Sequence, residues 1–411
     1  MRTYRELFRT PEFLPFFTTV SVQVAAQTAA GLALGTLVYA ATGSPLLSAL
    51  AMFGPSLAQV AGALTLLSAA DRLPPRATLT GLALLFALGT GVQAVPGLPL
   101  WAAFAVLLGL GVASSLGGGV RYGLLNEILP QRGFLLGRSV LNMAVGTMQI
   151  LGFAVGGVLV TALSARGTLL VGAALYVVAA ALARFGLTAR PPRASGRASV
   201  RETWRTNALL WSSAPRRSVY LALWVPNGLV VGCESLYIAY APAHAGLLFA
   251  CGALGMLTGD ALVGRFVPGR WRARLGAPLR LLLAAPYLVF ALNPGLPVAV
   301  VAVVLASVGF SASLLLQERL MALTPEELSG HALGLSSSGM LAMQGVGAAV
   351  AGSVAQLTSP GTGMAAVAAL SLAVTVALAP GLRAGRGREA EGRLQGEGSS
   401  RTTETKETTT S

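Results

Sequence analysis

Charged side chains are absent from long parts of this sequence. Residues 13–70 form a run of 58 positions without Lys, Arg, Asp or Glu, and similar runs recur up to residue 382. An ionised side chain costs at least a few kcal/mol in the hydrocarbon of a bilayer, and about 20 apolar residues in an α-helix cross about 30 Å of it. The run therefore predicts two membrane-spanning helices joined by a short uncharged turn.

The overall composition excludes a water-soluble fold. Charged residues make up only 11% of the chain and hydrophobic residues 54%, whereas soluble domains carry about 25% charged residues. Six apolar segments, each long enough for two crossings and most with turn residues near the middle, cover about 13–70, 77–120, 139–183, 218–264, 276–317 and 332–382. We therefore expect an all-α membrane protein with twelve transmembrane helices.

The distribution of arginine predicts the orientation in the membrane. Of the 29 Lys and Arg residues, all except Arg166 lie at the termini or in every second connection. The positive-inside rule then places these connections and both termini in the cytoplasm, for a multi-pass protein of the plasma membrane. The net charge of +14 does not indicate a nucleic-acid partner, because the cations form no basic face with residues that could read bases.

Cysteine and histidine are scarce, which argues against redox and metal chemistry. Cys233 and Cys251 lie in predicted helices and are expected to be packing residues. His331 lies at the cytoplasmic start of a predicted helix and His244 lies in a predicted outer loop, and we expect both to be solvated. No H-E-x-x-H, C-x-x-C or G-x-S-x-G pattern is present. We expect no enzymatic activity, no cofactor and no metal site.

An internal repeat predicts two similar halves. The pattern M-Q-x-x-G-x-A-V-x-G occurs at 148–157 and again at 343–352, and Pro130 and Pro325 share the same offset of 195 residues. Parallel repeats with a binding site between them are the architecture of alternating-access transporters. Chance similarity between two Gly- and Ala-rich helices is the alternative.

The repeat and the composition together predict the domain organisation. Two pseudo-symmetric six-helix bundles, 1–187 and 218–382, are joined by a basic cytoplasmic linker, 188–217. Residues 383–411 contain almost no apolar side chains and are expected to be a disordered cytoplasmic tail. We expect a monomer that has the lipid bilayer as its solvent.

Several motifs resemble the major facilitator superfamily of transporters over residues 1–382. Phe8-Arg9, the polar segment 21–27 and the Thr-Gly-Ser-Pro-Leu of 42–46 are similar to its macrolide-efflux-like and siderophore-exporter-like branch. The resemblance implies a secondary active transporter that works by alternating access. It further implies export of a small amphipathic or drug-like molecule as the substrate.

One matching segment implies a gating function. Residues 71–76 stand where the family carries a D-R-x-G-R-R loop between helices 2 and 3, although two prolines replace its glycine and one cation. The matching residues are Asp71, Arg72 and Arg76. The resemblance implies a cytoplasmic charge latch that holds the outward-facing state, with an ordinary interfacial turn as the alternative. In the second half, Asp260 and Arg265 form either the corresponding latch or a simple interfacial ion pair.

Residues 152–157 resemble the G-P-x-x-G-G signature of antiporters, with Phe153 in place of proline. Small residues in such a motif let two helices approach closely. The expected packing residues in this motif and its repeat are Gly152, Gly156, Gly157, Gly347 and Gly352. The helix 4 arginine of the family's proton antiporters has no counterpart in 104–109, which leaves proton coupling open.

One acidic residue lies deep in a predicted helix. Glu234 is about 24 Å along helix 7 from Ser218, at 1.5 Å per residue. An intramembrane carboxylate faces a cavity or a partner and can titrate or bind a coupling cation. Asn227 lies seven residues earlier on nearly the same face. The alternative is a carboxylate at the outer interface that reaches water.

Four amides complete the predicted site. Gln23 and Gln27 share a face of helix 1, and Gln149 and Gln344 are equivalent in the repeat. Buried amides need partners, which are either the substrate and water or another helix. Because no Lys or Arg is expected deep in the membrane, this cavity suits lipophilic or weakly cationic substrates.

Two other functions remain open from the sequence. The family motifs are eroded, which is compatible with a transporter-like membrane receptor or scaffold without flux. Import of a small metabolite is the other alternative.

Overall fold

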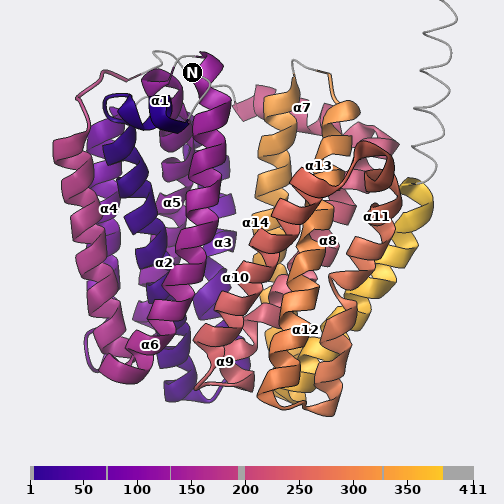
Figure 1. Cartoon of the computed structure of the whole chain (residues 1–411). Coiled ribbons are helices and arrows are strands. Elements are labelled where there is room, and N and C mark those ends of the chain that lie inside the picture. The colour runs from indigo at the N-terminus through magenta and orange to yellow at the C-terminus, as the bar shows by residue number, and fades with distance from the viewer. Residues whose placement is uncertain (1–3, 71–72, 130, 193–199, 326–327, 383–411) are drawn as a thin grey trace, which may run out of the picture.

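The computed structural model describes residues 4–70, 73–129, 131–192, 200–325 and 328–382, and every regular element in these ranges is a helix. Figure 1 shows the helices running side by side between two faces. We call the face that carries α1 and α7 the N-terminal side, and the face that carries α9 the far side. The all-α fold class is confirmed.

The first half of the chain contains α1 to α6. Their bounds are Tyr4–Arg9 (α1), Phe13–Thr42 (α2), Pro45–Ala70 (α3), Pro75–Gln93 (α4), Leu100–Ile128 (α5) and Gln131–Gly186 (α6). Phe13, Phe16 and Leu124 lie in a buried apolar cluster that joins α2 to α5 on the N-terminal side.

The second half follows a short helix, α7 (Val200–Ser212), which lies on the N-terminal side. The α-helices are Ala214–Ser235 (α8), Tyr237–Tyr240 (α9), Ala245–Ala261 (α10), Gly269–Leu282 (α11), Leu296–Val308 (α12), Ala312–Ala322 (α13) and Ser329–Leu357 (α14). A π-helix (Leu262–Phe266, η1) follows α10, and 3₁₀ segments η2 (Ala285–Leu292) and η3 (Gly309–Ser311) flank α12. A last apolar helix spans Pro360–Leu382.

The described chain crosses the membrane twelve times. It contains eleven apolar segments of sufficient length, but α6, with 56 residues, would be about 84 Å long if straight. It is divided at Ser164, where φ is 74° and ψ is 165°, so its segment counts as two crossings. The Ser-Ala-Arg-Gly sequence of 164–167, near the middle of the apolar segment 139–183, supplies this break. The prediction of twelve helices in two bundles is confirmed.

The predicted helix ends differ from the observed ones at two places. α5 continues to Ile128 rather than residue 120, so Arg121 lies inside a helix and not in a connection. Leu124, Leu125 and Ile128 are buried against other helices, and protein packing extends α5 beyond the thickness of the hydrocarbon. In the second half, α7 occupies part of the predicted linker and α8 begins at Ala214.

The two halves pack on each other through equivalent helices. Within the halves, α2 contacts α6 and α8 contacts α14; between them, α3 contacts α14 and α6 contacts α10. The M-Q-x-x-G-x-A-V-x-G repeat lies on α6 and α14, and each of these helices contacts both its own half and the other half.

Candidate functional site

Contacts between the halves gather on the far side. A Cβ added to Gly157 of α6 would lie 3.0 Å from the Cα of Gly246 on α10, and one added to Gly352 of α14 would lie 2.7 Å from the Cα of Leu46 on α3. The hydroxyl of Ser44 donates to Oε1 of Gln356 over 2.7 Å. The far side of the protein is therefore closed by direct helix contact.

The other small residues of the motif pack helices within one half. Gly152 faces Thr28 and Gly156 faces Ala29, both on α2. In the second half, Gly347 of α14 touches the carbonyl oxygen of Gly228 on α8. Each residue of the predicted packing motif therefore lies at a close approach between helices, which a side chain would obstruct.

One face of α2 extends from this contact region toward the N-terminal side and becomes less closely packed along the way. Gly35 lies against Ile238 of α9: a Cβ added to Gly35 would be 2.7 Å from the Ile238 side chain. Gly31 lies one turn before Gly35, and a Cβ placed on it would have no atom within 4 Å. Gln27 lies one further turn toward the N-terminus and is exposed. Because an exposed amide facing lipid at mid-helix would be costly, we infer that Gln27 faces the space between the halves. Its neighbour Gln23 is buried.

The two repeat glutamines occupy different surroundings. Gln149 is exposed and shares its face of α6 with Gly146, which faces Leu257, and with Phe153, whose ring stacks on Phe249 at 4.7 Å. It therefore points toward α10 of the other half. Gln344 is half-buried on α14.

Glu234 lies at the end of α8 and is enclosed by protein. Its side chain is only 7% exposed, and its Oε1 atom is buried without a hydrogen-bond partner. The carboxylate interacts electrostatically with the hydroxyl groups of Tyr237 and Tyr287, which are joined to each other by a hydrogen bond of 2.5 Å. Within the described residues, the ion pairs both belong to Arg190, so no cation neutralises Glu234. The carboxylate does not have the exposure of an interfacial group.

Asn227 links α8 to α13. Its Nδ2 donates to the carbonyl oxygen of Leu223 over 2.7 Å and to the hydroxyl of Ser313 over 2.9 Å. The side chain is 3% exposed. Its amide donor is therefore already bound by protein.

Only some of the predicted latch residues lie in the part of the chain that the structure describes. Asp71 and Arg72 lie outside the described residues, and Arg76 donates to the carbonyl oxygen of Leu187 over 3.4 Å. Asp260 and Arg265 are exposed, and no ion pair joins them. The predicted interfacial ion pair is thus not formed in this structure, where Arg265 lies in the π-helix η1 that directly follows α10.

A different ionic clamp lies on the N-terminal side, and the sequence did not reveal it. Arg190 binds Glu12 at 3.1 Å and Glu127 at 3.4 Å, and the hydroxyl of Thr188 donates to Glu12 over 2.6 Å. These contacts hold the chain after α6 against the start of α2 and the end of α5. The acids are separated from Arg190 by 178 and 63 positions, so no local motif announces the pairing.

Arg121 corrects the expectation that no cation enters the helices. It lies seven residues before the end of α5, its Nε atom is buried without a hydrogen bond, and it interacts electrostatically with Tyr176 of α6. The first half therefore holds a partly enclosed cation, and the second half holds a buried carboxylate.

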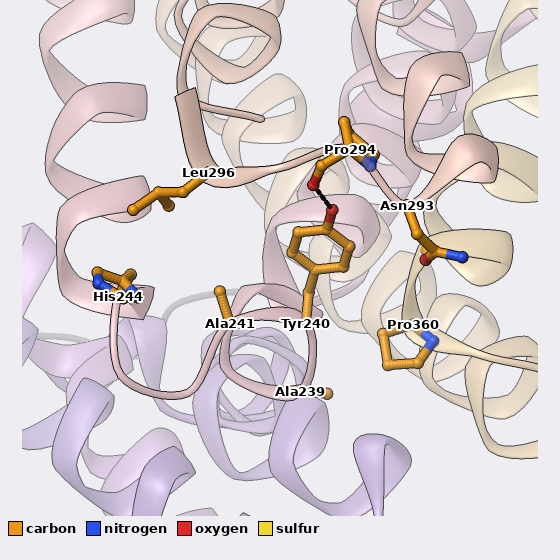
Figure 2. A pocket seen from close by; sticks show the side chains of 9 residues that line it. Ala239, Tyr240, Ala241, His244, Asn293, Pro294, Leu296 and Pro360 are labelled. Carbon is orange, nitrogen blue, oxygen red and sulfur yellow. Dashed lines mark hydrogen bonds between the residues drawn. The ribbon is translucent and has the colours of Figure 1, made fainter. Parts of the chain in front are cut away.

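A cavity of about 390 Å³ opens on the far side of the second half (Figure 2). His244, Asn293 and Leu296 line it, and the Tyr240 hydroxyl donates to the carbonyl oxygen of Pro294 over 2.6 Å. None of the predicted coupling or substrate residues lines this cavity. No group of three or more His, Cys, Asp or Glu side chains that could hold a metal lies in the described part of the chain.

The model of the Major Facilitator Superfamily matches residues 16–317 of this sequence. The chain belongs to this superfamily. Its members share the fold described above, so the protein is a membrane protein with the architecture of a secondary transporter. No curated protein matches the sequence.

Solved structures of other superfamily transporters resemble this one. A POT family transporter in complex with a thioalcohol-conjugated peptide has a TM-score of 0.69 at 11% identity, covering 89% of this chain and 95% of its own. A bacterial homologue of the human lysosomal transporter Spinster, in an inward-facing and unoccupied conformation, has a TM-score of 0.67 at 14% sequence identity. The match covers 94% of each chain. The nucleoside transporter NupG has a TM-score of 0.64 at 13% sequence identity, and the match covers 90% of this chain and 98% of the NupG chain. At such identities the likeness shows the fold alone.

Proposed function

We propose that this superfamily member is an alternating-access exporter of a small amphipathic or drug-like molecule, driven by a proton or cation that binds at Glu234. It acts as a monomer in the plasma membrane, with both termini in the cytoplasm. The observation that carries the proposal is the burial of Glu234 without a cationic partner.

A carboxylate in this position favours binding of a positive charge. An ionised group buried without a partner is strongly unfavourable, and the protein relieves this cost if the carboxylate takes up a proton or a cation. The two tyrosine hydroxyls nearby offer polar contacts but no charge. Loading on one side of the membrane and release on the other would then drive transport.

The substrate path is proposed to follow the space between the halves. Gln27 and Gln149 are exposed at mid-helix on faces that point toward the other half, and Gly31 leaves room beside them. These residues offer neutral hydrogen-bonding groups between apolar helices, which suits an amphipathic molecule.

The far-side contacts support alternating access. They close one end of this path with small residues, which can separate without leaving large cavities. We propose that the latch at Asp71, Arg72 and Arg76 stabilises the opposite state, in which the far side is open. The role of Asp260 and Arg265 in that state is part of the same proposal.

The test is a flux measurement in sealed proteoliposomes with a panel of lipophilic cations, neutral drugs and hydrophilic metabolites. Gradient-driven accumulation of an amphipathic compound, in the direction that corresponds to leaving the cytoplasm, supports the proposal. Accumulation in the other direction identifies an importer. Binding without flux for every ligand found would favour the receptor or scaffold function.

A further inference from the structure

α7 is a short helix outside the membrane spans that exposes apolar side chains. Leu210 is fully buried in a cluster with residues of α8 and α13. By contrast, Trp204 is 57% exposed and Leu209 is 55% exposed. The helix is therefore attached to the protein at its C-terminal end, and it exposes other apolar side chains.

The connection to α8 places α7 at the membrane surface. α7 ends at Ser212, and the next membrane span begins at Ala214. Figure 1 shows α7 on the N-terminal side, lying across the ends of the spanning helices. A helix at the start of a membrane span is expected in the headgroup layer, where Trp and Leu side chains can insert at the boundary with the acyl chains.

The surroundings of α7 are strongly basic. Residues 188–217 contain a single acid, Glu202, and the arginines 190, 193, 197, 201, 205, 216 and 217. Arg205 and Arg217 are exposed, and Arg205 is adjacent to Trp204. Arginines beside a spanning helix are attracted to anionic lipid headgroups, whereas zwitterionic lipids provide no such surface potential.

We propose that α7 docks on an anionic phospholipid surface, with Trp204 at the acyl boundary and Arg205 and Arg217 on lipid phosphates. A lipid fits this helix better than a soluble protein, because the chain itself holds the cations and the apolar side chains at the bilayer surface. The inference does not depend on the transported substrate or on Glu234.

Side-chain contacts connect α7 to the transmembrane helices, so docking at α7 would also affect them. The Trp211 ring stacks on Trp224 of α8 at 5.5 Å with an interplanar angle of 10°. The indole of Trp224 donates to the carbonyl oxygen of Ser336 on α14 over 3.0 Å. The aromatic stack thus connects the lipid-facing helix to the α8 and α14 pair.

The test uses a spin label at Ala208, which is exposed one turn after Trp204. The label is attached to Ala208→Cys in a protein with Cys233→Ala and Cys251→Ser. Its accessibility to oxygen and to a water-soluble nickel chelate is measured in nanodiscs of phosphatidylcholine, and in nanodiscs of equimolar phosphatidylcholine and phosphatidylglycerol. We expect higher oxygen and lower nickel accessibility only with phosphatidylglycerol, and loss of this difference at high salt.

Arg205→Gln with Arg217→Gln should remove the difference between the lipids, whereas Arg274→Gln, an exposed cation on α11 beside Trp271, should retain it. The salt dependence tests the charge interaction without any change in α7, so the result does not depend on the folding of the double variant. Equal insertion in both lipids would overturn the role of anionic headgroups. Nickel accessibility in both lipids would overturn docking altogether and leave α7 free for a soluble partner.

Discussion

Gly157 of α6 lies so close to Gly246 of α10 that a Cβ on Gly157 would be 3.0 Å from the Gly246 Cα. The equivalent residue in the repeat, Gly352, has the same relation to Leu46 at the start of α3. The two glycines of one sequence repeat thus form matching contacts between the halves on the far side. A side chain at either position would act as a wedge between helices from different halves.

We therefore expect Gly157→Leu to open the far side. Overpacking costs about 1–3 kcal/mol, which corresponds to a shift of roughly 5- to 150-fold in the equilibrium between the two states. Ile238→Cys, buried against Gly35 in the closed far side, should react faster with a membrane-impermeant thiol reagent in this background. Gly81→Leu, at an exposed site on α4 without a neighbour within 4 Å, is the control and should leave the rate unchanged.

The orientation can be tested with single cysteines. Ala243→Cys lies in an exposed far-side turn, and Ala214→Cys lies at the exposed start of α8 on the N-terminal side. Because the arginines gather on the N-terminal side, an impermeant reagent added to intact cells should label Ala243→Cys only. Labelling of Ala214→Cys in sealed cells would reverse the predicted topology.

Local chemistry explains how much of the fold could be predicted. Charge-free runs determine where helices can cross lipid, and the turn residues lie where the helices end, as at Gly43 and Gly97, where φ is positive. The repeat also marks Gly157 and Gly352 as equivalent positions, without reference to the helices that they contact. These features depend on residues that are neighbours in the sequence.

The missed features depend on tertiary contacts. Arg190 pairs with two acids far away in the sequence, and α5 extends past the membrane because Leu124 and Leu125 pack on α2. Hydropathy reports the preference for lipid, and it carries no information about which protein surface covers a helix end. The partners of Asn227 and the enclosure of Glu234 required the packed structure for the same reason.

The hydrogen bond from Asn227 to Ser313 should have a measurable coupling energy. A double-mutant cycle with Asn227→Ala and Ser313→Ala should give about 0.6 kcal/mol, the average for such bonds between membrane helices. Unfolding in a denaturing detergent supplies the four stabilities. Flux of Ser313→Ala should be nearly normal if this bond only joins α8 to α13, and a large loss of flux with unchanged stability would instead place the Asn227–Ser313 pair on the substrate path.

The latch and the Arg190 clamp should respond differently to mutation. Asp71→Asn is expected to slow transport and to increase the fraction of molecules in which the far side is closed. We expect no change in stability, because the proposed latch acts in one state only. Arg190→Gln removes both ion pairs of the described chain and should lower stability by less than about 1 kcal/mol, since the partners are partly exposed. If Asp71→Asn leaves the transport rate and the thiol reactivity of Ile238→Cys unchanged, the loop is an ordinary turn.

The decisive residue for coupling is Glu234. Glu234→Gln retains the shape and the hydrogen-bonding capacity of the side chain but removes its ability to carry a proton or bind a cation. We expect gradient-driven flux to be abolished while substrate still binds, and the thermal stability to be retained or increased, because Gln needs no neutralising partner in a site that supplies none. Glu6→Gln, an exposed carboxylate on α1, should transport normally. Full pH-dependent transport by Glu234→Gln would exclude the carboxylate from coupling and leave it as a buried packing residue.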